Sequence, residues 1–255
     1  MKVLFEKKDN ICIITINRPD VKNAIDRETA SQLSNAFRRF EQDNELYVAV
    51  LCGDSGSFCA GADLKQIANN NLNRMETDMS MDGPLGPTRM HLSKPVIAAI
   101  QGYAVAGGLE LALWCDLRVM ESDAIFGVFC RRFGVPLVDG GTQRLPRLIG
   151  MSRALDLILT GRSVDAKEAL EIGLTNRVVE PGMAIEEAVK LAKQIAAFPQ
   201  HCLRSDREAV YRGFNLEFDN GMQLEFLLGN NVVNSGVTHK GAKEFSDGKG
   251  RNGKF

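Results

Sequence analysis

The chain has 255 residues and a mass of 28.0 kDa, enough for one large or two modest domains with a core that needs no disulfide bonds. Its 31 Lys and Arg residues against 32 Asp and Glu residues give a net charge of -1, which predicts no nucleic-acid partner bound by bulk charge. Hydrophobic residues make up 44% and charged residues 25%, which is typical of a globular protein and argues against disorder.

The N-terminal segment and the cysteines indicate the compartment. Acidic residues occur within the first ten positions, which predicts neither a secretory signal nor an Arg-rich transit peptide. No apolar stretch approaches the roughly 18 to 20 residues that a membrane span requires. The cysteines lie far apart, mostly in apolar runs and with no CxxC pair, which indicates buried reduced thiols and no zinc ribbon. We therefore expect a soluble, cytoplasmic protein without a metal site or a membrane partner.

The first 60 residues predict two parallel strands joined by a helix. Residues 11–16 are β-branched and apolar and end at a turn, which is typical of a buried strand. From 27 to 42, apolar residues recur every three or four positions and therefore lie on one helical face. A second buried strand follows over residues 47–52. Because a strand, a helix and a strand in this order are joined by a crossover, we expect the two strands to be parallel.

The same pattern recurs further along the chain. A strand over residues 96–100 precedes a glycine-rich turn and a helix over 109–114, whereas residues 69–89 predict an irregular loop. Beyond about residue 140 the periodicity is mostly helical, with one strand-like segment over 176–179. We predict an α/β core over residues 1–199 and a helical C-terminal region over residues 200–255.

Two strand-to-helix turns, at positions 58–64 and 104–108, contain mainly residues with small side chains. Small residues let a ligand approach the backbone closely and leave amide N–H groups free to donate, and the second turn also opens a helix, whose N-terminus carries partial positive charge. One amide from each turn could form a two-donor oxyanion hole. The alternative is that both turns are tight connections in which only small residues pack.

Glu110 lies three residues after Gly107 and therefore on the same helical face, one turn further on. A carboxylate beside two amide donors can move a proton at a carbon next to a bound carbonyl group. The alternative role is compensation of the helix dipole at the surface. The apolar neighbours of Glu110 favour a buried, catalytic carboxylate.

The two turns, in this order and about 45 residues apart, resemble those of the crotonase superfamily, the enoyl-CoA hydratases and isomerases. The resemblance covers about residues 1–195 and is specific for the superfamily, but much less so for the reaction. Further segments that resemble family landmarks are Asn17-Arg18-Pro19, Asn23-Ala24, 94–99, 110–112, Cys115-Asp116, 140–145 and Thr160-Gly161.

The resemblance implies a spiral of ββα units with a C-terminal helical region used in a trimer or a dimer of trimers. It implies an acyl-CoA thioester as ligand and no metal or redox cofactor, since coenzyme A is part of the substrate. The amides of Ala62 and Gly107 are implied to hold the thioester oxygen. The implied substrate-binding residues are Ala60, Ala62, Asp63, Leu64, Lys65, Gly107 and Cys130.

The chain departs from the family pattern at the second catalytic position. Hydratases of this family place two glutamates on opposite sides of a water molecule; Glu110 matches the first, whereas Cys130 occupies the position of the second. A neutral thiol, with a reference pKa of about 8.5, cannot hold and orient water as a carboxylate does. Asp139 is the nearest substitute, and it is either the second catalytic carboxylate or the N-cap of the helix that follows.

Arg131 and Arg132 stand where the family is usually apolar. They either pair with Asp139 or Glu110, recognise a carboxylate on the acyl group, or face solvent. Of these roles, we expect a structural ion pair for one of the two arginines.

The leading hypothesis is an enzyme that hydrates 2-enoyl-CoA through an enolate held by Ala62 and Gly107, with Glu110 and Asp139 as catalytic residues. Cys130 favours a different reaction of the same superfamily, namely double-bond isomerisation or decarboxylation. A third alternative is a catalytically silent CoA-binding protein. A serine hydrolase built on the motif at residues 53–56 would need a histidine partner for Ser55, and none stands in a recognisable relation to it.

Overall fold

The computed structural model describes residues 1–250, which form two compact units: residues 1–195 and the helices from Ala196 onward. The sequence predicts this boundary between residues 199 and 200. No helix within the described range is long and apolar enough to span a membrane.

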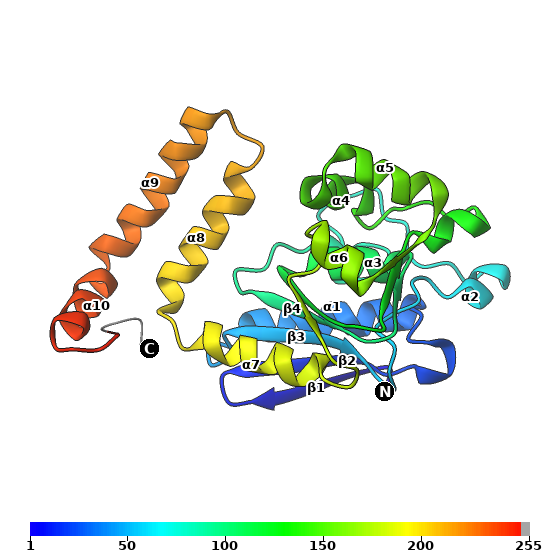
Figure 1. Cartoon of the computed structure of the whole chain (residues 1–255), viewed down its shortest axis with the longest axis horizontal. Helices are drawn as coiled ribbons and strands as arrows, with labels where there is room; N and C mark the ends of the chain where they lie inside the picture. Colours follow the sequence, from blue (N-terminus) through cyan, green and yellow to red (C-terminus); the bar gives the residue numbers. More distant parts are fainter. Residues whose placement is uncertain (251–255) are drawn as a thin grey trace. The chain divides into compact units, whose positions relative to one another are not determined.

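The first unit is built on two sheets, whose strands are coloured from blue to yellow-green in Figure 1. In the larger sheet β1 runs antiparallel to β2 and every other neighbouring pair is parallel. Its strands, in spatial order, are β1 (Val3–Lys8), β2 (Ile11–Ile16), β3 (Val48–Gly53), β4 (Val96–Ile100), β6 (Leu117–Glu121) and β9 (Arg177–Val179). The smaller sheet contains β5 (Tyr103–Val105), β7 (Ile125–Gly127) and β8 (Ser163–Asp165).

The chain repeats a strand in the larger sheet, a strand in the smaller sheet and then a helix. β4, β5 and α3 (Gly107–Trp114) form one such unit. β3, an isolated bridge from Cys59 to Ala104 and α2 (Leu64–Ala68) form the unit before it. This is the predicted series of ββα units. The remaining elements of the first unit are α1 (Arg27–Gln42), η1 (Pro19–Val21), η2 (Pro87–Arg89), η3 (Phe129–Phe133), α4 (Gly141–Ile149), α5 (Met151–Thr160), α6 (Ala166–Glu171) and α7 (Ala184–Ala196).

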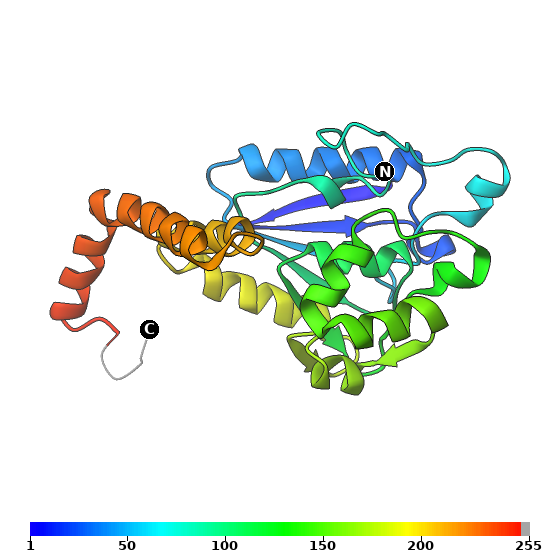
Figure 2. The same cartoon turned by 90° about the horizontal axis from the view of Figure 1, so that it is seen from above.

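Helix α1 (Arg27–Gln42) is fixed at both ends. At its start, the Asp26 carboxylate accepts the Thr29 backbone N–H at 2.8 Å. At its end, the buried Lys94 ammonium donates to the carbonyls of Phe40 and Asp43 at 2.8 Å each, where the helix dipole favours a positive charge. Figure 2 shows α1 along one side of strands β1 and β2, with α7 on the other side. The predicted apolar face of α1 is buried as expected.

The structure confirms the long periodic elements. The strands predicted over 11–16 and 96–100 and the helix over 27–42 have the predicted bounds, and β2 and β3 are parallel as expected. The segment 69–89 contains only the short η2, which agrees with the predicted irregular loop. Strands β1, β5, β6, β7 and β8 were not predicted; β5, β7 and β8 have three residues each, too few to show an alternating pattern.

The second unit is a helical hairpin followed by a shorter helix (Figure 1): α8 (Gln200–Gly213), α9 (Phe218–Asn234) and α10 (Val237–Ser246). It exposes large apolar side chains, among them Phe218 at 79% and Phe226 at 69% of their surface. Residues 251–255, the end of the predicted C-terminal region, lie outside the described residues.

The two predicted turns lie directly against each other. A Cβ atom added to Gly108 would lie 2.0 Å from the Cys59 carbonyl oxygen, and one added to Gly61 would lie 2.8 Å from the Gly107 nitrogen. Because these neighbours are backbone atoms, they cannot rotate away as a side chain could. The absence of side chains at these glycines is therefore what lets the two turns meet.

We predict that Gly108→Ala lowers the free energy of unfolding by about 3 kcal/mol or more, since the added methyl group overlaps backbone. The matched control is Gly229→Ala, in the middle of α9 with open space around its Cα atom; there alanine should stabilise the helix by roughly 0.5–1 kcal/mol. Urea unfolding of both variants measures the difference. Equal effects of the two changes would contradict the backbone contact.

Candidate active site

The first turn presents the Ala62 amide outwards from a clamped backbone. Ile25 pairs with both neighbours of Ala62: the Ile25 N–H donates to the Gly61 carbonyl at 2.7 Å, and the Asp63 N–H donates to the Ile25 carbonyl at 3.1 Å. In this arrangement the Ala62 N–H points away from Ile25, and it has no acceptor within residues 1–250.

The second turn presents the Gly107 amide. Gly107 is the first residue of α3, and the first N–H groups of a helix have no partner inside the helix. Ala106 before it adopts φ 54° and ψ −125°, a conformation that costs a residue with a side chain about 1–3 kcal/mol. Strain of this kind persists only where the surrounding structure enforces it. The Ala62 and Gly107 amides thus belong to two turns that touch; that both donate to one carbonyl oxygen stays a prediction.

The residues predicted to line the coenzyme have different surroundings. Asp63 is buried, and its carboxylate caps α2 through the Lys65 and Gln66 amides and pairs with Arg18 at 2.9 Å. This gives Asp63 a structural role independent of any ligand. Leu64 and Lys65 are exposed, and Ala60 is half-buried.

Glu110 is buried in α3 and held by the backbone of the loop before α4. Its Oε1 atom accepts the N–H of Asp139 at 3.0 Å and the N–H of Gly141 at 2.8 Å. A Cβ atom at position 141 would lie 2.9 Å from the same oxygen, so only glycine permits this contact. Glu110 is therefore a fixed, enclosed carboxylate and not a surface residue that compensates the helix dipole.

Asp139 is also buried, and the structure excludes the N-cap alternative. The N-cap of α4 is Gly140, without a side-chain hydrogen bond. The Asp139 Oδ1 atom instead accepts the Leu85 N–H at 3.0 Å and the Thr88 hydroxyl at 2.5 Å. The second carboxylate oxygens of Glu110 and Asp139 accept no hydrogen bond within residues 1–250. Neither of them is among the fully buried side-chain atoms that lack a hydrogen-bond partner, so both are accessible. Each carboxylate thus keeps one oxygen for a ligand.

The two carboxylates influence each other's protonation. Burial, together with the negative charge of Asp139, raises the pKa of Glu110 to about 7. Burial also raises the pKa of Asp139, although the hydrogen bonds from Thr88 and Leu85 and the charges of Arg89 and Arg144 oppose the change. Near neutral pH Glu110 is therefore present in both its protonated and its ionised form, a state suited to acid and base catalysis.

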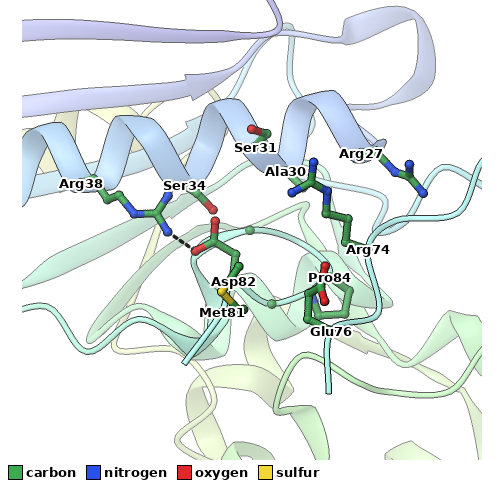
Figure 3. A pocket seen from close by; sticks show the side chains of 12 residues that line it. Arg27, Ala30, Ser31, Ser34, Arg38, Arg74, Glu76, Met81, Asp82 and Pro84 are labelled. Carbon is green, nitrogen blue, oxygen red and sulfur yellow. Dashed lines mark hydrogen bonds and ion pairs between the residues drawn. The ribbon is translucent and has the colours of Figure 1, made fainter. Parts of the chain in front are cut away.

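The segment 81–88 connects this pair to the Gly107 turn, and the sequence did not single out its residues. The Leu85 amide binds Asp139, while a Cβ atom at Gly107 would lie 2.3 Å from Leu85 Cδ1. The other side of the segment forms a cleft with α1, in which Arg38 pairs with Asp82 and Arg74 lies over Ala30 (Figure 3). The paired Gly-Pro steps at 83–84 and 86–87 were the one available signal that this loop is built tightly.

Cys130 lies in η3 and is buried, and Glu110 affects the pKa of its thiol. Burial and then the negative charge of Glu110 raise the pKa of its thiol, so the side chain is neutral beside the carboxylates. The sequence prediction that Cys130 cannot replace a carboxylate agrees with this state.

The expected ion pair of Arg131 or Arg132 was wrong. Neither side chain pairs with a carboxylate of the described chain. Arg131 donates to the Ile158 carbonyl at 3.2 Å, and Arg132 donates to the Gly161 carbonyl at 2.7 Å and stacks on Phe129. Both arginines therefore cap the C-terminal end of α5, where unpaired carbonyls attract cations.

Two other sequence expectations concern reactive side chains. Five of the six cysteines are buried and all are unpaired, as predicted, but Cys202 is exposed on α8. Ser55 is exposed, and its hydroxyl contacts Asp54 at 3.0 Å; no hydrogen bond joins it to a histidine of the described chain. A serine-hydrolase site is therefore not formed here.

Comparison with known proteins agrees with this geometry. The sequence profile of the enoyl-CoA hydratase/isomerase family matches residues 6–251. The chain is 35% identical to the short-chain-enoyl-CoA hydratase of Clostridium acetobutylicum, over 88% of this chain and 86% of that protein. It is 34% identical to the (E)-benzylidenesuccinyl-CoA hydratase of Thauera aromatica, over 97% and 96%.

Solved structures show the same fold. An enoyl-CoA hydratase from Mycobacterium tuberculosis superposes with a TM-score of 0.91 at 37% identity, with 96% of each chain covered. One from Bacillus anthracis gives a TM-score of 0.87 at 32% identity, covering 97% of this chain and 96% of that one. The predicted crotonase-like α/β fold is confirmed, and this chain, with two free amides beside a buried carboxylate pair, belongs to the enoyl-CoA hydratase/isomerase family.

Proposed function

We propose that this enzyme adds water across the double bond of a 2-enoyl-CoA thioester, with Glu110 and Asp139 as its two catalytic carboxylates. The observation that carries the proposal is the buried Glu110–Asp139 pair, on the helix that begins at Gly107 and on the loop packed against that helix, with the pKa of both carboxyl groups raised. Curated relatives that include a crotonyl-CoA hydratase of Syntrophomonas wolfei, 36% identical, support the same reaction type.

The two amides would polarise the thioester. The carbonyl oxygen gains negative charge when the acyl group becomes an enolate, and the N–H groups of Ala62 and Gly107 stabilise that charge more strongly than the neutral carbonyl. Loss of one such donor typically costs about 2.7–4 kcal/mol of transition-state stabilisation. Coenzyme A enters and leaves as part of the substrate, so the proposed chemistry needs no cofactor.

The carboxylate pair would move the protons. The oxygen of water forms a bond to C3 of the acyl chain while the ionised carboxylate takes one proton from that water. The protonated carboxyl group gives its proton to C2, where the enolate electron pair forms the new C–H bond. The product is a 3-hydroxyacyl-CoA, and the pair again carries one proton. A positioned acid or base typically accelerates such a step roughly 100- to 10,000-fold.

Cys130 favours a second candidate function, which is either double-bond isomerisation or decarboxylation. Both need the enolate but no water at C3, and a buried neutral thiol cannot help to orient that water. Incubation with 2-enoyl-CoA in deuterated water separates the candidates: hydration yields a 3-hydroxyacyl-CoA with deuterium at C2. Tight binding of acetoacetyl-CoA without turnover of any thioester would instead indicate a silent CoA-binding protein.

We further infer a homotrimer or a dimer of trimers in a reducing compartment such as the cytoplasm. The exposed aromatic side chains of α8 and α9 and the absence of disulfide bonds among the described cysteines support this. Sedimentation velocity of the full chain measures the assembly.

Glu110→Gln should lower kcat for crotonyl-CoA at least 100-fold, because the amide can still accept the two backbone N–H groups but cannot transfer a proton. Unchanged turnover would remove Glu110 from the mechanism. A steady-state hydration assay gives the result.

The same variant should be more stable than the parent at alkaline pH. The folded-state pKa of Glu110, about 7, lies above the unfolded value of 4.5, so the parent loses stability from this group as pH rises between these values. Glu110→Gln has no such loss. Its free energy of unfolding should exceed that of the parent by up to about 3 kcal/mol at pH 8, and the difference should vanish near pH 4.5. Denaturant unfolding at both pH values checks the sign; a variant that is less stable at pH 8 would contradict the raised pKa.

Asp139→Asn should also lower kcat at least 100-fold if Asp139 supplies the second carboxylate. The matched control is Cys130→Ser, which changes the residue at the family's second catalytic position without altering the carboxylates, and it should stay within about threefold of the parent. The opposite ranking of the two variants in a hydration assay would assign the second role to Cys130.

A further inference from the structure

We propose that Thr88 is a positioning residue: its hydroxyl keeps Asp139 ionised and oriented, so that the proton shared by the pair resides on Glu110. The inference rests on the proposed function and adds a residue that lies outside the segments resembling the family. It assigns the proton donor and the proton acceptor within the carboxylate pair, which the sequence does not do.

The contact is short and enclosed. Thr88 Oγ1 lies 2.5 Å from Asp139 Oδ1, and the Leu85 N–H donates to the same oxygen at 3.0 Å. Thr88 is only 2% exposed, so water cannot replace its hydroxyl. Two donors on Oδ1 fix the plane of the carboxylate and leave Oδ2 to face a ligand. Because donors stabilise the charged form, they favour an ionised Asp139.

The contacts around Thr88 restrict the position of its hydroxyl group. Arg144 joins the two loops, donating to the Thr88 carbonyl at 2.7 Å and to the Asp139 carbonyl at 2.8 Å. A Cβ atom on Gly83 would lie 2.0 Å from Thr88 Oγ1 and 2.9 Å from Asp139 Oδ1. The Thr88 hydroxyl therefore fits only because residue 83 has no side chain, and the space around it is too small for the hydroxyl to move away from Asp139.

The charges around the pair act in the same direction as Thr88. Arg89, on the same short helix, and Arg144, on α4, favour the ionised form of Asp139. On α3, Glu110 faces the negative charge of Asp139, and on η3 the thiol of Cys130 stays neutral. Without the Thr88 hydroxyl, Asp139 would bind protons more strongly and compete with Glu110 for the shared proton.

The test compares Thr88→Val, which keeps the shape but removes the donor, with Thr88→Ser, which keeps the donor. In Thr88→Val, the acidic limb of the pH dependence of kcat/KM for crotonyl-CoA should move up by roughly one pH unit, the worth of a hydrogen bond to a charged group. The alkaline limb, which reports Glu110, should stay in place, and Thr88→Ser should restore the parent profile.

Thr175→Val is the matched control for the loss of a buried threonine hydroxyl. Thr175 is 3% exposed and donates to the Arg118 carbonyl at 3.1 Å. It makes no hydrogen bond to Glu110 or Asp139. It should lower thermal stability as Thr88→Val does while leaving both limbs unchanged. A Thr88→Val profile that matches the Thr175→Val profile would overturn the proposal.

A second measurement does not depend on turnover. In protein labelled with carboxyl carbon-13 aspartate, the Asp139 signal is identified by its absence from Asp139→Asn, and its titration should move to higher pH in Thr88→Val but not in Thr88→Ser. An unchanged titration overturns the role of Thr88. Absence of hydration by the parent enzyme, with the titration shifted as expected, would instead overturn the proposed function alone.

Discussion

Contact between two pieces of backbone determines this active site. The turn at residues 59–62 and the start of α3 meet at Gly61 and Gly108, where a single methyl group would collide with the Gly107 amide or the Cys59 carbonyl. Backbone hydrogen bonds with Ile25 hold the first turn, and the strained conformation of Ala106 directs the second. Both donors are main-chain groups, so their direction is fixed by the fold and not by a rotatable side chain.

The carboxylate pair depends on the same region. Glu110 follows Gly107 in α3, and the loop at residues 139–141 reaches it only because Gly141 has no side chain. Burial then raises the pKa of Glu110 to about 7, which places a proton donor beside the amides at physiological pH. Ionisation of a buried carboxyl group is unfavourable, so the pair lowers the stability of the folded protein.

The sequence predicted the elements whose pattern is local. Residues 11–16, 27–42 and 96–100 show their period directly, and the two small-residue turns resembled a known family closely enough to suggest Ala62, Gly107 and Glu110 as site residues. It could not exclude the N-cap role of Asp139, because the partners that hold its carboxylate, Leu85 and Thr88, lie about 50 positions away. It also misjudged Arg131 and Arg132, whose acceptors are backbone carbonyls of α5 that carry no mark in the sequence.

Leu85 has a further consequence for substrate choice. Its side chain lies against Gly107 and its amide donates to Asp139, so one residue touches both the amide turn and the carboxylate pair. An acyl tail that displaced Leu85 would disturb carbonyl activation and water attack together. Discrimination among acyl groups would then show itself in the speed of turnover of bound thioesters more than in how tightly they bind.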